Sequence, residues 1–478
     1  MSTMSWQDIQ TETGGRWIIE PASDSQAPRG VSIDTREIRK GQIFVAYIGA
    51  QTDGHAYLSQ AQMRGASMCI VTDESKVPGS IRIPILEVGD PTDAMTALAK
   101  KYRSTLSATV IGVTGSNGKT TTTRLIHSVL NHAGNAWVSS KSHNNAIGVP
   151  MSVLNTPIDA EYAIYEIGTS SLGEIETRSS LIEPDISVIT SIGRAHLEEL
   201  GSLSGVCKEK ASILRSTQKV GIIPGGPGGP GGPGGNDELD EAVRALDPGC
   251  RVERIHAGDI HSLVMNEQSV VFELDGAKFK APVPGRHNAM NAANAVRVGR
   301  VCGIDDRAIA DGLVNAQLPE MRLDRVEIPT SDEPIVVYND AYNANPDSTR
   351  AALEFFGDLQ THSNKVVVLG DMLELGDSGP DQHASILSEL QASLGRIILV
   401  GELYCQAGEA TGGTNKDMYT VSDMYTMTEI ARSIRPGDVV LLKGSRAIGL
   451  ERLVYVLINR FTPFVHAGSA TDGGRQYR

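Results

Sequence analysis

The sequence predicts an α/β protein with a small N-terminal α/β domain, a central domain whose mostly parallel sheet has helices on both faces, and a C-terminal doubly wound domain. The length of 478 residues suggests about three domains. Short apolar runs alternate with helical stretches, which indicates parallel sheets. An apolar run at residues 110–114 breaks into a glycine-rich turn, followed by Lys119 and four threonines. This pattern is typical of a strand, a phosphate-binding loop (P-loop) and a helix.

The first predicted domain covers residues 1–106. Short apolar runs at residues 42–48 and 67–71 predict strands. The spacing of apolar residues predicts a helix over residues 91–104, at the end of this domain.

The second predicted domain covers residues 107–319 and contains the P-loop. A helix is expected from Thr120 onward, and strands are expected at residues 161–166 and 185–190. A further helix is expected at residues 204–214. The third predicted domain, residues 320–466, is Rossmann-like. Its expected strands lie at residues 335–338, 365–369, 396–400 and 438–443. Nucleotide and substrate would then meet between domains, and residues 467–478 are expected to form a flexible tail.

A Pro-Gly-Gly unit is repeated four times over residues 224–235. The glycine period is that of collagen, but collagen needs long arrays and three chains. The repeat follows an apolar run and precedes more strand-like sequence. We therefore expect an enlarged surface loop inside the central domain.

The bulk composition is that expected of a large soluble enzyme. The net charge is −14, from 43 basic and 57 acidic residues, and no basic block favours binding to nucleic acid. The five cysteines are scattered, which indicates neither a disulfide framework nor a zinc site. The N-terminus is polar, and no run approaches the ~18 apolar residues of a membrane span. We expect a cytoplasmic monomer.

The P-loop residues Gly115, Ser116, Asn117, Gly118, Lys119, Thr120 and Thr121 are expected to bind ATP. Backbone N–H groups of such a loop point at phosphate oxygens, the lysine reaches the β- and γ-phosphates, and the Thr120 hydroxyl is offered to Mg²⁺. Val113 stands where the strict pattern has glycine. The alternative is a glycine-rich turn with a surface lysine.

Glu166 ends the predicted strand at residues 161–166. A strand that runs into a carboxylate is a common way of presenting a Mg²⁺ ligand beside a P-loop. Acidic residues at strand ends are also common without any metal, so both interpretations stand on the residues alone.

Several motifs in chain order resemble the Mur ligases, ATP-dependent amide-forming enzymes of peptidoglycan precursor synthesis. The P-loop, Glu166-Ile-Gly, Ala195-His196-Leu-Glu and Lys210 are similar to the central domain of that family, whose own form of the loop explains Val113. The resemblance covers almost the whole chain. The motifs that flank the central ones are Asp34-Thr-Arg36 followed by Gly41-Gln-Ile-Phe-Val-Ala46, Asn144-Asn-Ala-Ile-Gly-Val-Pro150, Gly285-Arg-His-Asn-Ala-Met-Asn291, Asp340-Ala-Tyr-Asn-Ala-Asn-Pro346, Leu369-Gly-Asp-Met-x-Glu-Leu-Gly376 and Lys443-Gly-Ser-Arg446.

These flanking motifs are similar to the branch of the family that adds D-alanyl-D-alanine. The Asp-Asn-Pro-Arg run of the branch that adds diaminopimelate or lysine is not found. The resemblance implies a ligase that joins D-alanyl-D-alanine to a UDP-N-acetylmuramoyl tripeptide through an acyl phosphate, with ATP as the phosphate donor. Alternatives are another Mur-type ligase with a different amine, a nucleotide-binding regulatory protein without turnover, and a generic P-loop hydrolase.

The resemblance implies catalytic roles for Lys119, His196 and Lys210. Two Mg²⁺ ions are expected, one held by Thr120 and a second by Glu166 and His196. Lys210 would react with CO₂ to form a carbamate, which requires a neutral amine and hence a lowered pKa. The alternatives are a helix-cap or core histidine at position 196, and an ordinary solvated lysine at position 210, with Lys208 as the competing assignment.

The resemblance also assigns residues to the nucleotide. Asn288 and Asn291 lie three apart at a predicted helix start, so their amides share one face and can pair with adenine. Arg322 and Asp340 would reach the ribose and phosphates from the last domain. The alternatives are a helix cap for Asn288 and a surface ion pair for Arg322.

The remaining assignments concern the other two substrates. Tyr342, Asn343, Asn345, Lys443 and Ser445 would bind the dipeptide and the acyl phosphate, although an Asn- and Pro-containing segment is by itself more often a turn. Ser32, Thr35 and Arg36 would hold the UDP-sugar, and Asn144 and Asn145 would line the path of the muramoyl peptide.

Overall fold

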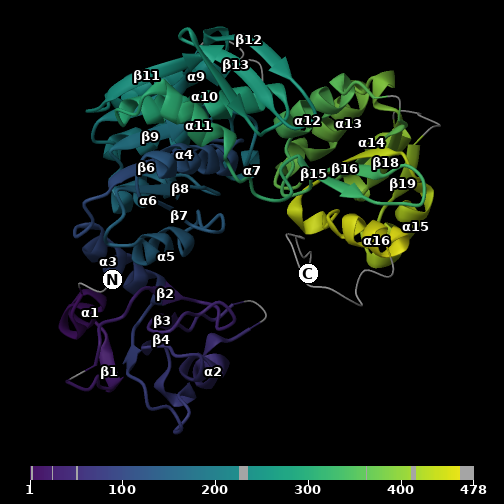
Figure 1. Cartoon of the computed structure of the whole chain (residues 1–478). Coiled ribbons are helices and arrows are strands. Elements are labelled where there is room, and N and C mark those ends of the chain that lie inside the picture. The colour runs from purple at the N-terminus through teal and green to yellow at the C-terminus, as the bar shows by residue number, and fades with distance from the viewer. Residues whose placement is uncertain are drawn as a thin grey trace.

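Three lobes follow one another along the chain in the computed structural model (Figure 1). The structure describes residues 1, 4–23, 25–49, 52–225, 235–361, 363–410 and 416–462. Within these residues the strands form four sheets, and the predicted α/β class is confirmed. None of the helices in the described segments is long and apolar enough to cross a membrane.

The N-terminal lobe is built on a five-stranded sheet in the order β1-β5-β4-β3-β2. Strand β1 is antiparallel to β5, and the other pairs are parallel. The strands predicted at residues 42–48 and 67–71 and the helix predicted at 91–104 are confirmed with shorter bounds. The elements are α1 (Trp6–Thr13), β1 (Arg16–Ile19), β2 (Val31–Ser32), β3 (Ile43–Val45), η1 (Gly54–Tyr57), α2 (Leu58–Met63), β4 (Met68–Val71), η2 (Glu74–Lys76), β5 (Ile85–Glu87) and α3 (Pro91–Arg103).

The central lobe contains a six-stranded parallel sheet in the order β11-β10-β9-β6-β8-β7. Strand β6 lies between β8 and β9, so the connections from β6 to later strands run in both directions along the sheet. The P-loop therefore follows β6 at the switch point of the sheet, where ligands commonly bind. The elements of this part are β6 (Thr109–Thr114), α4 (Lys119–Ala133), β7 (Ala136–Val138), α5 (Gly148–Asn155), β8 (Tyr162–Glu166), α6 (Glu174–Ile182), β9 (Ile186–Ile189), α7 (Leu197–Leu200), α8 (Leu203–Ala211), η3 (Ser212–Ser216), β10 (Val220–Gly225), α9 (Gly235–Leu246) and β11 (Arg251–His256).

Helices cover both faces of the central sheet, as predicted. Successive residues of β6 point to opposite faces, so Val110 packs in one apolar cluster and Ile111 and Val113 pack in another. The first cluster includes side chains of α3, α5, α6 and α8. The second includes side chains of α4, of α10 (Arg286–Val301) and of α11 (Asp306–Val314).

A separate three-stranded antiparallel sheet, β12-β13-β14, packs against α10 and α11. The sequence indicated strand-like residues here but not a sheet of its own. Its strands are β12 (Ile260–Met265), β13 (Val270–Leu274) and β14 (Ala277–Ala281), preceded by η4 (Ala257–Asp259). The Pro-Gly-Gly repeat begins at Pro224, within β10, and ends at Gly235, the first residue of α9. The strands β10 and β11 are neighbours in one sheet. Residues 226–234 of the repeat fall outside the described residues.

The C-terminal lobe has a six-stranded sheet in the order β15-β16-β20-β17-β18-β19, parallel except for β15. The four strands predicted in this part are confirmed to within two residues, and the predicted tail at residues 467–478 lies outside the described residues. The elements are β15 (Asp324–Ile328), β16 (Ile335–Asp340), α12 (Pro346–Asp358), β17 (Lys365–Gly370), η5 (Gly376–Ser378), α13 (Gly379–Ser388), η6 (Ala392–Leu394), β18 (Arg396–Val400), α14 (Glu402–Ala410), β19 (Lys416–Tyr419), α15 (Met424–Ser433), β20 (Val439–Lys443), η7 (Arg446–Ile448) and α16 (Arg452–Phe461).

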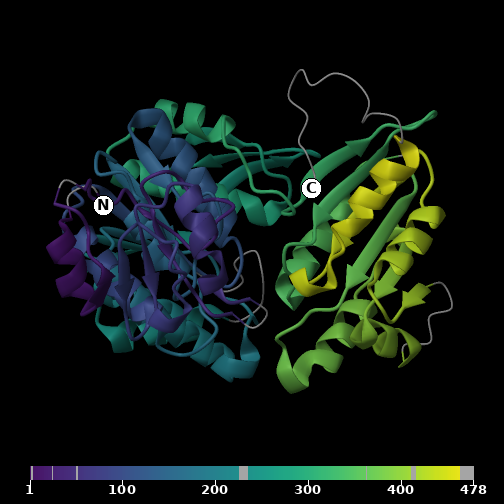
Figure 2. The ribbon, with the colours of Figure 1, turned by 90° about the horizontal axis from the view of Figure 1, so that it is seen from below.

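The N-terminal and central lobes share an apolar core, whereas the C-terminal lobe has separate cores of its own. One cluster runs without a break from the N-terminal lobe, with Ile43 and Met68, into the central lobe, with Val110 and Val149. The two clusters of the C-terminal lobe contain residues of that lobe alone. Figure 2 shows the C-terminal lobe standing beside the other two.

The side chain of Asn155, at the end of α5, joins the central lobe to the edge strand β2. Its Oδ1 accepts hydrogen bonds from Val31 N at 3.2 Å and Gln42 Nε2 at 2.9 Å, and its Nδ2 donates to Val31 O at 2.9 Å. Gly30 has φ of 130°, and a Cβ there would lie 2.4 Å from Asn155 Oδ1. The amide therefore holds the strand that carries Ser32.

Replacing Asn155 with alanine is expected to lower the free energy of unfolding by about 2 kcal/mol, because the buried N–H of Val31 loses its acceptor and Val31 O keeps only the longer bond from Gln42 Nε2, at 3.3 Å. Urea unfolding followed by circular dichroism measures this change. The control is Asn131→Ala, at an exposed position near the end of α4, which should stay within about 0.5 kcal/mol of the parent. Equal effects of the two substitutions would contradict this account of Asn155.

Candidate active site

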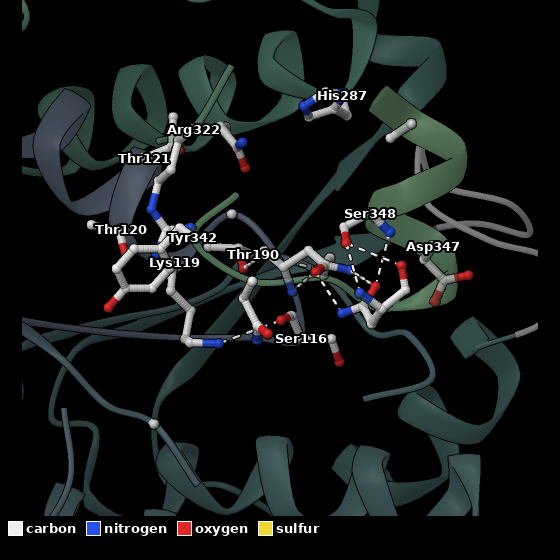
Figure 3. Close-up of a pocket in the computed structure, with 18 of the residues that line it drawn as sticks. Ser116, Lys119, Thr120, Thr121, Thr190, His287, Arg322, Tyr342, Asp347 and Ser348 are labelled. Carbon is white, nitrogen blue, oxygen red and sulfur yellow. Dashed lines mark hydrogen bonds between the residues drawn. The ribbon is translucent and has the colours of Figure 1, made fainter. Parts of the chain in front are cut away.

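A cavity of about 290 Å³ lies between the central and C-terminal lobes (Figure 3). The P-loop, the ends of β8 and β9 and the start of α10 form one wall, and the ends of β16 and β20 with the start of α12 form the other. Most of the predicted site residues line it. They are Ser116, Asn117, Gly118, Lys119, Thr120, Thr121, Asn144, Asn145, Glu166, His196, Asn288, Asn291, Arg322, Asp340, Tyr342, Asn343, Asn345 and Lys443.

The P-loop has the backbone shape that its glycines allow. Gly115 has φ of 146° and Gly118 has φ of 80°; a Cβ at these positions would lie 2.1 Å from Thr190 Oγ1 and 2.3 Å from Asn291 Oδ1. Side chains are thus excluded, and the loop leaves its backbone open to a ligand. Val113 lies inside β6 and is fully buried in the core, so no glycine is required there.

Lys119 lies at the start of α4 beneath the loop. Its Nζ donates to Gly115 O at 2.7 Å and to Ser116 O at 3.4 Å. Burial lowers the pKa of Lys119, and the charge of Glu166 acts against that shift. A cation held in a poorly solvated place attracts an anion strongly, which fits the phosphate groups of a nucleotide. Lys119 is half-buried and lines the cavity, so the alternative interpretation as a lysine on the outer surface is wrong.

Hard oxygen donors stand next to the P-loop. Thr120 Oγ1 lies 3.1 Å from Ser142 Oγ, and Glu166 is 8% exposed and accepts a hydrogen bond from Asn144 Nδ2 at 2.7 Å. Mg²⁺ is typically bound by one or two carboxylates together with substrate phosphates and water. The donor set therefore fits Mg²⁺ bound together with a nucleotide. Ser142 was not among the predicted residues.

His196 connects the two lobes. It occupies the left-handed region with φ of 54°, and its Nδ1 lies 2.9 Å from Glu374 Oε2 of the C-terminal lobe. This contact lowers the pKa of Glu374. His196 precedes α7 at the cap position but makes no side-chain cap bond, and it is not a core residue, since its side chain is 24% exposed.

Lys210 is buried in α8, with 1% of its surface exposed, whereas Lys208 is exposed. Burial, followed by the charge of Lys119, lowers the pKa of Lys210 well below its usual value. Its ammonium makes no hydrogen bond with any of the described residues. The interpretation as an ordinary solvated lysine is therefore wrong for Lys210 and holds for Lys208.

Asn288 and Asn291 share one face of α10, as predicted. Asn291 Nδ2 donates to Asn288 Oδ1 at 2.7 Å, and Thr122 Oγ1 donates to Asn291 Oδ1 at 3.2 Å. Gly285 occupies the cap position of the helix, so the alternative of a cap role for Asn288 is wrong. Neighbouring His287 faces the same cavity, and burial lowers its pKa to about 4, so it is neutral at pH 7.

Charged side chains of the C-terminal lobe close the other wall. Asp340 and Lys443 end neighbouring parallel strands in register, and Lys443 Nζ lies 2.8 Å from Asp340 Oδ2. The guanidinium of Arg322 stacks over the ring of Tyr342 at 4.2 Å, on the side of the cavity that holds Thr120 and Thr121 (Figure 3). Arg322 thus makes a stacking contact in the cavity wall in place of the alternative surface ion pair.

Two polar contacts join the P-loop side to α12. Asn345 Nδ2 donates to Asn117 Oδ1 at 2.8 Å, and Asn117 Nδ2 donates back to Asn345 Oδ1 at 3.3 Å. Asn345 also caps α12 by accepting a hydrogen bond from Ser348 N. Asp347 accepts from Arg194 N at 2.9 Å, and burial raises the pKa of Asp347.

Replacing Asn345 with aspartate is expected to keep the helix cap and to remove the donor to Asn117. The free energy of unfolding should change by less than about 0.5 kcal/mol. kcat/KM for ATP should fall about 2- to 10-fold, which corresponds to one lost hydrogen bond. Asn345→Ala removes the cap as well and should destabilise the protein by about 1 kcal/mol. Parent-like kinetics of Asn345→Asp would show that the contact does not support the site.

Some predicted residues lie elsewhere. Gly115 belongs to the P-loop and Lys210 to α8, and neither lines the cavity. Ser445 is 4% exposed, and its hydroxyl accepts a hydrogen bond from Leu373 N, so it braces a loop behind the cavity wall. The N-terminal lobe holds Ser32, Thr35 and Arg36 away from this cavity; Thr35 Oγ1 donates to Gln60 Oε1 at 2.6 Å, and Arg36 pairs with Asp34.

Further cavity residues were missed from the sequence. Thr190 and Ser191 follow β9, the neighbour of β6, so the rule that ligands bind at the carboxyl ends of parallel strands could have found them. The other missed polar residues were not assigned from the sequence, although His287 lies within the quoted motif at residues 285–291. They include Thr169, Ser170, Arg178, His287, Asp347 and Ser348.

Comparison with known proteins identifies the family. Three family models match consecutive parts of the chain: "Mur ligase family, catalytic domain" at residues 28–103, "Mur ligase middle domain" at residues 113–299, and "Mur ligase, glutamate ligase domain" at residues 322–446. A UDP-N-acetylmuramoyl-tripeptide--D-alanyl-D-alanine ligase of Bacillus subtilis is 32% identical over 454 residues, which cover 92% of this chain and 95% of that relative.

Solved structures agree with this family. A crystal structure of MurF from Acinetobacter baumannii matches with a TM-score of 0.78 and 30% identity, and the match covers 95% of this chain and 98% of that one. The fold is also that of MurF from Thermotoga maritima in complex with ADP, with a TM-score of 0.71, 24% identity, and coverage of 90% of this chain and 97% of that one. The chain therefore belongs to the Mur ligase family.

Proposed function

We propose that this chain is an ATP-dependent ligase that joins D-alanyl-D-alanine to a UDP-N-acetylmuramoyl tripeptide in peptidoglycan precursor synthesis. The products are the UDP-N-acetylmuramoyl pentapeptide, ADP and phosphate. The Bacillus subtilis relative, which bears this activity in its name, covers 92% of the chain. Within the molecule, the proposal is carried by one observation: the same cavity holds the P-loop and Glu166 on one wall and Asp340 and Lys443 on the other.

A carboxylate is a poor electrophile and must be activated before an amine can attack it. In the proposed first step, an oxygen of the tripeptide carboxylate attacks the γ-phosphorus of ATP, and the bond to the β,γ-bridging oxygen breaks, which gives an acyl phosphate and ADP. The neutral amine of D-alanyl-D-alanine then attacks the acyl carbon. Phosphate leaves with the bonding electron pair, and the amine loses a proton as the amide forms.

The residues on each wall suit these steps. Lys119 neutralises charge on the phosphates, which is the main task of the protein in phosphoryl transfer. Asn288 and Asn291 are proposed to bind adenine, and Arg322 and Asp340 to bind the ribose and phosphates. Tyr342, Asn343, Asn345 and Lys443 are proposed for the dipeptide and the acyl phosphate. Ser445 accepts a hydrogen bond from Leu373 N and donates to Ala344 O at 3.5 Å, so in this proposal it acts by bracing the loop that carries Tyr342, Asn343 and Asn345.

Two Mg²⁺ ions are proposed, the first held by Thr120 and the second by Glu166 and His196. Bound Mg²⁺ would supply Lewis-acid stabilisation of the transferring phosphoryl group. For the second site, His196 must leave Glu374 or bind through its other ring nitrogen, since Nδ1 lies 2.9 Å from that carboxylate. Asn144 holds Glu166 in place from the adjoining loop.

Lys210 is proposed to carry a carbamate. Its neutral amine nitrogen attacks the carbon of CO₂ and forms an N–C bond, one C=O electron pair moves onto oxygen, and the nitrogen releases one proton. A buried lysine whose pKa lies well below its usual value supplies the neutral amine that this step needs. The product is an anion in place of a cation.

We also propose a division of labour along the chain. Residues 1–106 bind the UDP-sugar through Ser32, Thr35 and Arg36, residues 107–319 bind ATP, and residues 320–466 bind the dipeptide. Asn144 and Asn145 line the path of the muramoyl peptide. The substrates are small molecules, no nucleic-acid partner is proposed, and the proposed state is a cytoplasmic monomer.

The test is the dependence of phosphate release on the amine. The purified chain is mixed with ATP, Mg²⁺ and the UDP-muramoyl tripeptide, and phosphate release and product mass are measured with D-alanyl-D-alanine, D-alanine, L-lysine or diaminopimelate. Stimulation by D-alanyl-D-alanine alone, with the pentapeptide as product, is expected. Stimulation by another amine would identify a different ligase. Phosphate release without any amine would identify a hydrolase, and nucleotide binding without turnover would identify a regulatory protein.

A further inference from the structure

The loop of residues 139–147 connects β7 to α5 and contacts two of the oxygen-bearing side chains proposed for Mg²⁺. Ser142 Oγ lies 3.1 Å from Thr120 Oγ1, and Asn144 Nδ2 donates to Glu166 Oε1 at 2.7 Å. The hydroxyl of Ser142 can accept the proton of Thr120, which leaves the lone pairs of Thr120 free for a cation. The 139–147 loop therefore orients both oxygen donors.

Apolar packing does little to hold the 139–147 loop. None of its residues is buried, and Ile147 alone among them packs against an apolar cluster. A cavity of about 10 Å³ separates the loop from α4 and α5. The hydroxyls of Thr123 and Ser152 line this cavity and have no hydrogen-bond partner among the described residues. The position of the loop therefore depends on its hydrogen bonds.

Arg124 supplies two of these hydrogen bonds from α4. Its Nη2 donates to Ser139 O at 2.7 Å and to Ser140 O at 2.8 Å, and the side chain is half-buried. Arg124 follows Thr120 by four residues, which places both side chains on the same face of α4. Hydrogen bonds from a charged donor are roughly twice as strong as those between neutral groups. The helix that begins at the P-loop thus holds the start of the loop through Arg124.

Other attachments of the 139–147 loop lie further along it or on the surface. Gly168 N donates to Asn144 O at 2.8 Å, in the second half of the loop. Lys141 pairs with Glu37 of the N-terminal lobe, but both side chains are more than half exposed, and such ion pairs add little stability. Arg124 is therefore the strongest attachment of the first half of the loop.

We propose that Arg124 is a positioning residue for the Mg²⁺-bound nucleotide, because it fixes the loop whose side chains orient Thr120 and Glu166. This inference rests on the proposed function and on its Mg²⁺ sites. Loss of Arg124 would leave the P-loop in place and loosen the groups that orient the two oxygen donors. Asn144 and Asn145 belong to the same loop, so the proposed path of the muramoyl peptide depends on Arg124 as well.

The experiment compares the full-length parent with Arg124→Met, Arg124→Lys and Arg307→Met. Arg307 is the matched control, an exposed arginine of α11, a helix that packs against α4. Binding of the β,γ-imido analogue of ATP is measured by calorimetry with Mg²⁺ and, separately, with EDTA. Hydrogen–deuterium exchange follows the 139–147 loop in the free protein. Steady-state kinetics gives KM for the UDP-muramoyl tripeptide and for D-alanyl-D-alanine.

Arg124→Met is expected to weaken binding of the analogue about 10-fold in the presence of Mg²⁺, as for other residues that support metal ligands. With EDTA the affinity should stay within about 2-fold of the parent, because the P-loop is unchanged. Exchange in the 139–147 loop should be faster, and KM should rise for the tripeptide but not for the dipeptide. Arg124→Lys keeps the charge and should lie between Arg124→Met and the parent, and Arg307→Met should match the parent.

Two results would overturn the inference. One is an unchanged affinity with Mg²⁺ in a folded Arg124→Met variant. The other is an equal loss of affinity with Mg²⁺ and with EDTA, which would show that Arg124 supports α4 as a whole. If thermal unfolding shows that Arg124→Met does not fold, Arg124→Lys decides by the same two criteria. A parent that forms no pentapeptide would count against the proposed ligase, whereas the binding and exchange results would still decide the role of Arg124.

Discussion

Replacing Lys119 with methionine is expected to lower kcat about 10²- to 10³-fold, the range found when a preorganised electrostatic donor is removed from an active site. Methionine keeps most of the length of the side chain and removes the charge. The ammonium sits beneath the P-loop, bonded to Gly115 O at 2.7 Å, and can turn to phosphate without moving the backbone. Phosphate release and pentapeptide formation, followed together, measure the loss.

The control for this substitution is Lys100→Met, at an exposed position of α3, for which activity should stay within about 2-fold of the parent. Thermal unfolding of both variants shows whether the fold is kept. Lys119 makes its hydrogen bonds to two backbone carbonyls, so a moderate loss of stability is compatible with the prediction. Full turnover by a folded Lys119→Met variant would remove Lys119 from the mechanism.

Replacing Lys210 with methionine is expected to lower kcat about 10- to 100-fold, the range found for residues that orient a metal site from behind its ligands. Stability should not fall, because a buried amine with no hydrogen bond among the described residues is exchanged for an apolar side chain of similar volume. Steady-state kinetics at several Mg²⁺ concentrations, with urea unfolding alongside, separates the two effects.

Lys208→Met is the matched control, two residues away on the same helix and exposed. It should leave kcat and the Mg²⁺ requirement unchanged. A large loss in Lys208→Met with a parent-like Lys210→Met would reverse the assignment of the two lysines. Loss of stability in Lys210→Met, with normal activity in the folded fraction, would make Lys210 a structural residue.

Local features of the site were predictable because their residues are close in sequence. The P-loop needs a strand, glycines at positive φ and a lysine within a few positions, and all of these are visible in the chain. The choice between Lys208 and Lys210 was also available from helical spacing. Lys210 follows the buried Val206 and Cys207 by four and three residues, which places it on the same face, whereas Lys208 falls on the other.

Contacts between distant segments were not predictable in this way. Asn117 and Asn345 are 228 residues apart, and nothing in either neighbourhood indicates the other. The contact of His196 with Glu374 likewise depends on how two lobes pack. The bracing role of Ser445 depends on how the loops after β17 and β20 meet within the C-terminal lobe. The roles of individual side chains toward nucleotide, metal and dipeptide stay predictions, because they depend on groups that bind in the cavity.

The unequal division of the apolar cores sets which part of the molecule can move. The N-terminal and central lobes share one continuous core, whereas the C-terminal lobe keeps its own. The contacts that line the cavity between them, such as Asn117 with Asn345, are polar and can be exchanged for water at little cost in free energy. Opening would therefore swing the C-terminal lobe as one body and free ADP and phosphate. A sugar nucleotide anchored on the N-terminal lobe would stay in place while this happens.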